Sequence, residues 1–159
     1  IGFILLAAAT MGRLWCASYI AGRKDGELVR EGPYSVVRNP LYVSNFLGGV
    51  GFGLAAENLI ATAIIFVLFV IFYPAVVRSE EKRLEAKFGN AFRRYKGAVP
   101  RWWPNLSLYH EPAEHVIRPR LLRRAYFNAM WFMWAFLLWE ILEKLQGIGI
   151  IIPMIWSVV

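Results

Sequence analysis

The feature that most constrains this chain is the run of apolar residues 59–77, which is interrupted only by Thr62 and Tyr73. A helix needs about 20 mainly apolar residues to cross the hydrocarbon core of a bilayer, and this run is long enough. Because the core holds no water, a spanning segment has to satisfy its own backbone hydrogen bonds, which favours a helix. The chain is therefore expected to be built around helices that cross a membrane.

Further apolar segments surround this run. Three of them are candidates for helices: residues 1–20, 41–56 and 125–142. Only Glu57 and Asn58 separate residues 41–56 from residues 59–77, and this short polar break predicts a helical hairpin with a tight tip. We predict an all-α fold, an integral membrane helical bundle of about four or five segments that includes the hairpin.

Arg13 is a charged residue within the first apolar segment. A charged side chain inside a bilayer is costly, so it usually faces the protein interior or extends to the membrane interface. Arg13 is near enough to the end of its segment for the second arrangement, and the sequence leaves both open.

The composition and the distribution of charge agree with a membrane protein. The chain is 58% hydrophobic, whereas a soluble domain is about 45–50% apolar. Its formal net charge is +7, which in a soluble protein would suggest nucleic acid as a partner. Here Lys and Arg cluster beside apolar runs, and cytoplasmic loops of membrane proteins have the same bias, so no nucleic acid is expected. Both basic flanks of the hairpin are therefore expected on the cytoplasmic side, opposite the tip.

No metal site or disulfide is predicted. Cys16 is the single cysteine, which excludes an internal disulfide. Residues 110–115 imitate a metalloprotease motif, but His110 and His115 are five positions apart instead of four, and Pro112 breaks the helix that the motif requires. The chain begins at Ile1, without Met and within an apolar run, so further residues are expected upstream.

The most distinctive polar stretch is residues 31–42, which read Glu-Gly-Pro-Tyr-Ser-Val-Val-Arg-Asn-Pro-Leu-Tyr. Pro40 has no N–H and a fixed φ, so it suits the first turn of a helix and favours an extended Asn39 before it. Arg38 and Asn39 are then held at the start of a helix, beside free backbone N–H groups. This arrangement predicts a site for a polar or anionic ligand at the membrane boundary.

A second charged stretch, residues 78–95, is amphipathic. Spacings of three and four residues place five side chains on one helix face: Glu81, Leu84, Phe88, Phe92 and Tyr95. A carboxylate on an apolar face has to be paired or functional, and Arg78, three residues before Glu81, is the expected partner. Within residues 41–56, Gly49 and Gly53 form a small-x-x-x-small pair, for which helix packing is favoured over ligand contact.

Together the two polar stretches resemble the signature of the membrane methyltransferases that include isoprenylcysteine carboxyl methyltransferase and phospholipid methyltransferases. The family pattern is Gly-Pro-Tyr, Arg-His-Pro-x-Tyr, an apolar hairpin, Glu-Glu-x-x-Leu-x-x-x-Phe-Gly-x-x-Tyr-x-x-Tyr and Val-Pro-Arg. The match covers roughly residues 32–104. In this chain Asn39 stands at the His position and Phe92 at the first Tyr position.

The resemblance implies that residues 1–159 form a single membrane-embedded methyltransferase domain with a cytosolic-side pocket for S-adenosylmethionine. The predicted catalytic residues are Arg78 and Glu81. The predicted cofactor-binding residues are Arg38, Asn39, Pro40, Tyr42, Gly48, Glu80, Glu81 and Tyr95. Asn39 can form hydrogen bonds but does not titrate near pH 7, so a mechanism with a His base at this position is excluded.

The acceptor is expected to be a lipophilic or lipid-anchored molecule at the cytosolic membrane boundary, with membrane lipids as surroundings. A carboxylate acceptor is already charged at neutral pH and needs an Arg, whereas an amine has to lose a proton, with Glu81 as a candidate base. Two alternatives remain open. One is an NADPH-dependent membrane sterol or lipid reductase, a class that resembles this family in its C-terminal part; the other is a non-catalytic membrane scaffold.

Overall fold

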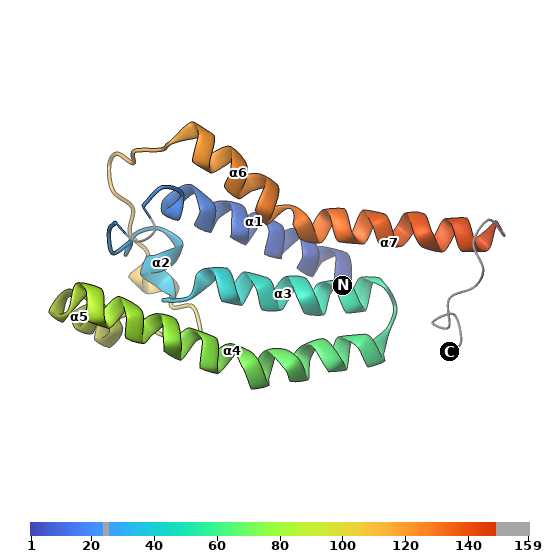
Figure 1. The fold of residues 1–159 in the computed structure, drawn as a ribbon, viewed down its shortest axis with the longest axis horizontal. Helices are drawn as coiled ribbons and strands as arrows, with labels where there is room; N and C mark the ends of the chain where they lie inside the picture. The colour runs from blue at the N-terminus through green and yellow to red at the C-terminus, as the bar shows by residue number, and fades with distance from the viewer. Residues whose placement is uncertain (24–25, 149–159) are drawn as a thin grey trace.

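The computed structural model describes residues 1–23 and 26–148, and all the regular elements in these residues are helices (Figure 1). The elements are α1 (Gly2–Ile20), α2 (Pro33–Val36), α3 (Pro40–Ala55), α4 (Leu59–Phe88), α5 (Asn90–Ala98), the 3₁₀ turn η1 (Leu106–Leu108), α6 (Pro119–Ala129) and α7 (Trp131–Gly147). The prediction of an all-α fold is confirmed. Among the described residues, three helical stretches are long and apolar enough to cross a membrane: Gly2–Ile20, Leu59–Phe88 and Pro119–Gly147.

Helices α3 and α4 form the predicted hairpin. Its tip is closed by Glu57, whose φ is 52°, and by Asn58, whose side-chain oxygen accepts a hydrogen bond from the Ala61 N–H at 2.8 Å. An asparagine at this position satisfies one of the free N–H groups at the start of α4. In Figure 1 the tip lies at the opposite end of the molecule from α2 and α5, as the charge distribution predicts.

Glycines set the spacing between α3 and its neighbours. A Cβ at Gly53 would lie 2.4 Å from Thr62 Oγ1, and one at Gly49 would lie 2.9 Å from Ile65 Cγ2, so both face α4. A Cβ at Gly51 would lie 2.8 Å from the Leu6 backbone nitrogen on α1. The interpretation of Gly49 and Gly53 as a helix-packing pair is confirmed, since these contacts leave no room for a side chain.

Helix α4 is longer than a membrane span. Its 30 residues extend for about 45 Å at about 1.5 Å per residue, whereas the hydrocarbon core is about 30 Å thick. The charged residues that follow Val77 therefore continue the same helix beyond the bilayer. Figure 1 shows α4 bent near its midpoint, and Pro74 lies inside the helix near that point. Gly89, with φ of 52°, ends α4 and begins α5.

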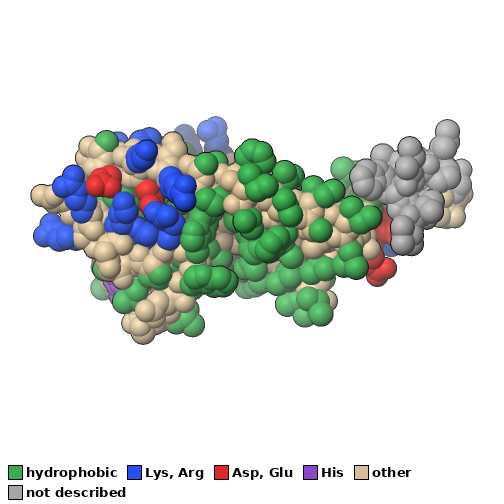
Figure 2. Space-filling view, turned by 90° about the horizontal axis from the view of Figure 1, so that it is seen from below, with side chains coloured by type: hydrophobic (Ala, Val, Ile, Leu, Met, Phe, Trp, Pro, Cys, Tyr) green, Lys and Arg blue, Asp and Glu red, His purple; other side chains and the backbone are tan. Residues whose placement is uncertain are grey.

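Charged and apolar surfaces occupy different parts of the molecule. Figure 2 shows Lys and Arg gathered at one end of the visible face and a broad hydrophobic surface along the rest of the described chain. In the apolar part of α4, many large side chains are exposed, among them Ile64, Phe66, Val67, Leu68, Val70 and Ile71. A helix with exposed apolar side chains on this scale is suited to contact with lipid.

Candidate functional site

The first wall of the site is the short segment that leads from α2 into α3. Gly32 begins it with φ of 58°, and a Cβ there would lie 2.4 Å from the Tyr19 ring, so both the backbone and the space require glycine. The Tyr95 hydroxyl of α5 donates a hydrogen bond to the Tyr34 carbonyl at 2.7 Å. Asn39 precedes α3 and Pro40 is its first residue, as predicted from the missing N–H of proline.

The second wall is the irregular segment that follows α5. Three backbone hydrogen bonds attach it to the first wall: Arg38 N–H to the Pro100 carbonyl (2.8 Å), Asn105 N–H to the Val36 carbonyl (2.9 Å) and Gly32 N–H to the His110 carbonyl (2.9 Å). The Asn39 side-chain nitrogen also donates to the Arg101 carbonyl at 3.3 Å. These contacts bring Arg101 over the charged end of α4.

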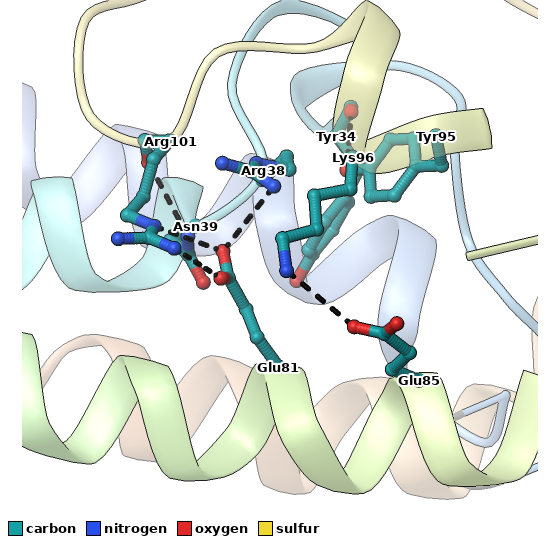
Figure 3. A network of polar contacts seen from close by, with 8 residues as sticks. All are labelled: Tyr34, Arg38, Asn39, Glu81, Glu85, Tyr95, Lys96 and Arg101. Atoms are coloured by element: carbon teal, nitrogen blue, oxygen red, sulfur yellow. Dashed lines mark hydrogen bonds and ion pairs between the residues drawn. The ribbon is translucent and has the colours of Figure 1, made fainter. Parts of the chain in front are cut away.

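Glu81 lies at the centre of the site and is only 4% exposed (Figure 3). Arg101 approaches its carboxylate in a bidentate manner, with Nη2 at 2.6 Å from Oε2 and Nε at 3.2 Å from Oε1. Arg38 Nη1 lies 3.6 Å from Oε1 on the other side. The predicted pairing of Glu81 with Arg78 is wrong, because Arg78 is exposed on α4 and two arginines from outside the helix contact the carboxylate.

Glu80, the neighbouring carboxylate, has different partners. It accepts a hydrogen bond from the Tyr42 hydroxyl at 2.7 Å and forms a 3.8 Å ion pair with Arg83. Its side chain is 28% exposed, whereas that of Glu81 is 6% exposed. The two adjacent glutamates therefore face different surroundings, one open to solvent and one enclosed by arginines.

These walls enclose a cavity of about 280 Å³. The predicted residues that line it are Arg38, Asn39, Pro40, Tyr42, Glu80, Glu81 and Tyr95. Arg78 and Gly48 are not in the lining; Gly48 is buried within α3. Leu84 and Phe92 from the same apolar face as Glu81 complete part of the wall.

Arg38 has two buried donors at the polar cavity. Its Nε and Nη1 atoms are buried and have no hydrogen-bond partner among residues 1–23 and 26–148. Nη1 lies 3.6 Å from Glu81 Oε1, an ion pair without a hydrogen bond. Buried donors without a hydrogen bond are costly, so these two atoms are candidates to bind an anionic group. Burial lowers the pKa of Arg38, and the neighbouring Glu81 opposes that effect. Burial also raises the pKa of Tyr95, which therefore stays a neutral hydroxyl and donor.

A second cavity, of about 610 Å³, lies among α1, α3, α4 and α7. It is lined mainly by apolar and aromatic side chains, including Phe52, Leu68, Phe69, Phe72 and Trp131. Arg13 and Asn45 line both cavities, so they mark the place where the polar cavity meets the apolar one.

Several residues of the site were not predicted from the sequence. Arg101, which contacts Glu81 from outside the cavity lining, lies in the Val-Pro-Arg part of the family pattern, and this was a signal that could have identified it. Tyr34 also lies within a quoted motif, Gly-Pro-Tyr. Asn45 had no such signal, because a polar residue in an apolar helix is placed on a cavity only by the packing of its neighbours.

In the part of the chain that the structure describes, no group of three or more His, Cys, Asp or Glu side chains is arranged to hold a metal ion. The motif-like residues 110–115 lie in an irregular segment, where His115 stacks on Tyr19 with ring centroids 4.8 Å apart.

Comparison with known families identifies the chain. A sequence profile described as phospholipid methyltransferase matches residues 3–91, which include the hairpin and both glutamates. The chain belongs to the phospholipid methyltransferase family. Together with the three apolar helices, this membership makes it a membrane protein.

Three similar proteins extend the comparison. The chain is 41% identical over 84% of its length to the nickel-cobalt-cadmium resistance protein NccN of Alcaligenes xylosoxydans xylosoxydans, and covers 62% of that protein. It is 37% identical over 95% of its length to the cobalt-zinc-cadmium resistance protein CzcN of Cupriavidus metallidurans, and covers 69% of it. It is 31% identical over 48% of its length to the protein-S-isoprenylcysteine O-methyltransferase of Schizosaccharomyces pombe, and covers 33% of that protein. No solved structure matches the chain.

Proposed function

We propose that the chain is an enzyme that transfers a methyl group from S-adenosylmethionine to a lipophilic or lipid-anchored acceptor at the cytosolic boundary of a membrane. The observation that carries the proposal is the pair of adjoining cavities, one polar with unpartnered buried Arg38 donors and one apolar at the level of the spanning helices. The phospholipid methyltransferase profile and the similarity to an isoprenylcysteine O-methyltransferase support it.

The polar cavity has groups that suit the methyl donor. S-adenosylmethionine would bring a carboxylate, an ammonium group, ribose hydroxyls and adenine, and it supplies a methyl group activated by a positive sulfur. Arg38 would bind the carboxylate through Nε and Nη1, which have no hydrogen-bond partner among the described residues. Glu80, which is partly exposed and bonded to Tyr42, would accept from the ammonium group or the hydroxyls. Tyr95 and Phe92 offer aromatic surfaces for the adenine.

Glu81 is assigned a positioning role in this proposal. Its carboxylate lies between Arg38 and Arg101, so it keeps two like charges in place on one side of the cavity. The pair of arginines around one carboxylate leaves a net positive charge, which favours an anionic group of a ligand. Arg78, exposed and outside the cavity lining, is given no part in the site.

The apolar cavity would hold the hydrophobic part of the acceptor. It lies among membrane-spanning helices and meets the polar cavity at Arg13 and Asn45. An acceptor whose tail occupies the apolar cavity would have its polar end directed towards the donor site. Methyl transfer depends strongly on alignment and on exclusion of water, and enclosure by both cavities would provide these.

A direct test is calorimetric titration of the detergent-solubilised protein with S-adenosylhomocysteine. Arg38→Gln should weaken binding about 10–100-fold, the loss expected for a charge-assisted hydrogen bond. The matched control is Arg94→Gln on α5, an exposed arginine outside both cavities, which should bind as the wild type does. Equal affinities for the wild type and Arg38→Gln would argue against this site.

The reaction itself is tested by incubating the wild type with labelled S-adenosylmethionine and a total lipid extract, and identifying the labelled product by mass spectrometry. Ultraviolet cross-linking with labelled S-adenosylmethionine against labelled NADPH separates the proposal from a reductase. Cross-linking to NADPH alone would contradict methyl transfer.

The cytoplasmic location of the site is part of the proposal. It rests on the basic residues at the end of the molecule that holds the polar cavity and on the tip at Glu57 and Asn58, which has no Lys or Arg. The test is Asn58→Cys in a Cys16→Ser background, probed with a membrane-impermeant thiol reagent. Labelling from the cytoplasmic side of sealed vesicles would place the tip on that side. The site would then lie on the opposite side of the membrane, and its cytoplasmic location would be wrong.

A further inference from the structure

Arg13 of α1 lies where the two cavities meet, although it belongs to a candidate membrane span. Its side chain therefore faces the protein interior, which decides between the two arrangements that the sequence left open. Nη1 donates to the Asn45 side-chain oxygen of α3, and Nη2 donates to the Asn128 carbonyl near the end of α6 at 3.0 Å. An intramembrane arginine held in this way by two other helices is a candidate functional group.

Two neutral groups orient the guanidinium. Asn45 and the Asn128 carbonyl are neutral acceptors, so these two hydrogen bonds direct the planar group without cancelling its charge. The three carboxylates that line the neighbouring polar cavity have partners of their own: Arg23 for Glu27, Tyr42 for Glu80 and Arg101 for Glu81. The positively charged guanidinium therefore lies at the passage between the cavities.

A positive charge at this junction discriminates between acceptors. It attracts a carboxylate or a phosphate and repels an ammonium group, and in surroundings of low dielectric constant both effects are stronger than in water. The adjoining apolar cavity, with Phe52, Phe69 and Trp131 in its lining, suits a hydrocarbon tail. The matching ligand has an anionic group at one end and an apolar chain at the other.

We propose that Arg13 is a specificity-determining residue, which binds a carboxylate or phosphate group of an amphiphilic acceptor at the junction of the two cavities. The assignment of this ligand as the acceptor rests on the proposed function. The binding of an anionic amphiphile by Arg13 does not require a methyl donor, so it is measured separately.

The experiment uses cis-parinaric acid, a naturally fluorescent fatty acid, and the corresponding alcohol as probes in detergent. Trp131 lines the apolar cavity, so energy transfer from tryptophan to the bound probe reports binding. For the wild type, the acid should bind at least about 10-fold more tightly than the alcohol, as expected for a charge-assisted hydrogen bond. Competition with oleate and with a lysophosphatidic acid then identifies the preferred anionic group, and oleylamine should displace the probe poorly.

Two variants test the role of Arg13. Arg13→Gln should lose about 10–100-fold in affinity for the acid and little for the alcohol, because only the acid uses the charge. Asn45→Asp keeps Arg13 but places a carboxylate beside it, and it should lower the affinity for the acid by a similar factor. The control Arg94→Gln should bind both probes as the wild type does.

The proposal is overturned if the wild type binds acid and alcohol equally, if Arg13→Gln lowers the affinity for both probes alike, or if oleylamine competes as well as oleate. The second result would mean that Arg13 only holds α1, α3 and α6 together. Loss of S-adenosylhomocysteine binding by Arg38→Gln tests the methyl-donor site independently, so failure of one proposal is distinguishable from failure of the other.

Discussion

The two ends of this molecule are held together in different ways. At the charged end, side chains from α2, α4, α5 and the segment after α5 meet, and Val37, Phe92 and Glu81 are 3%, 1% and 4% exposed. In the membrane half, only 6% of the apolar window of α4 is buried inside the protein, against 33% for α1. The same helix, α4, therefore contributes a packed wall at one end and a lipid-facing surface at the other.

The difference follows from the solvent on each side. In water, burial of apolar surface stabilises a fold at about 25 cal/mol per Å², so the charged end gains from every side chain that it encloses. In lipid, an exposed Leu or Ile loses nothing by contact with acyl chains, and helices associate through close packing and hydrogen bonds instead. This explains why glycines of α3 lie at its closest approaches to α1 and α4, beside ring contacts such as that of Phe46 with Phe69.

The largest effect that follows from the comparison is expected for Phe92→Ala. Phe92 lies on the face of α5 that lines the cavity and is almost fully buried, so truncation of its side chain should destabilise the protein by about 3–5 kcal/mol. The matched variant is Ile71→Ala in the membrane half, where the side chain is 61% exposed and a loss below about 1 kcal/mol is expected. Chemical denaturation in one detergent measures both. Similar losses would show that the two halves are stabilised alike.

A second prediction concerns charge at the two adjacent glutamates. Glu81→Gln removes the carboxylate that lies between Arg38 and Arg101, and leaves two arginines close together in a buried site. We expect a loss of about 2–3 kcal/mol, somewhat less than for a completely broken buried pair because Gln retains an acceptor oxygen. Glu80→Gln, at a more exposed position, should cost about 1 kcal/mol or less.

Melting curves and titration with S-adenosylhomocysteine should be recorded for both glutamate variants. If Glu81 positions Arg38, its loss should lower stability and ligand affinity together. A fall in affinity with no fall in stability would mean that Glu81 contacts the ligand directly, as expected from the sequence.

The same contrast explains what the sequence could predict. The apolar half was predictable, because long apolar runs and the short break at Glu57 and Asn58 are local patterns that fix helices and their connection. The first wall of the site was predictable as well, since Pro40 and Gly32 determine their own backbone conformations. These features depend only on residues near one another in the chain.

The partner of Glu81 could not be predicted in this way. Arg78 was the expected partner because it lies one helical turn away, whereas Arg101 reaches Glu81 only after α5 and an irregular segment have turned back along residues 32–38. That path is fixed by backbone hydrogen bonds between segments about 60 residues apart, such as the bond from Arg38 N–H to the Pro100 carbonyl. No periodicity within one helix contains this information.

A third prediction tests the role of glycine in the membrane half. In Gly53→Ala the new Cβ would lie 2.9 Å from Thr62 Cα and 3.0 Å from its backbone nitrogen, so α3 and α4 would have to move apart. Overpacking of this kind costs about 1–3 kcal/mol. The control is Gly97→Ala in α5, where no atom lies within 4 Å and the replacement should stabilise by about 0.5–1 kcal/mol. A stabilising Gly53→Ala would disprove close packing in the hairpin.

The smallest effect is expected where the charged end is attached to α1 through Glu111. The carboxylate accepts hydrogen bonds from the Tyr109 and Tyr19 hydroxyls, and these bonds lower its pKa below the ordinary value of 4.5. Because the pKa is lower in the folded state, the stabilisation is fully present above the ordinary pKa and is lost as the pH falls through the lowered value.

Glu111→Gln should therefore melt at a slightly lower temperature than the wild type at pH 7, and the difference should shrink as the pH falls below about 4. Glu114→Gln, an exposed glutamate three residues further along the same segment, should follow the wild type at every pH. A difference between Glu111→Gln and the wild type that persists unchanged at low pH would show that the hydroxyls bind the protonated Glu111 as well as the ionised one. The charge of Glu111 would then contribute nothing, and the segment after α5 would be held to α1 by contacts such as the rings of His115 on Tyr19 and of Tyr109 on Trp15.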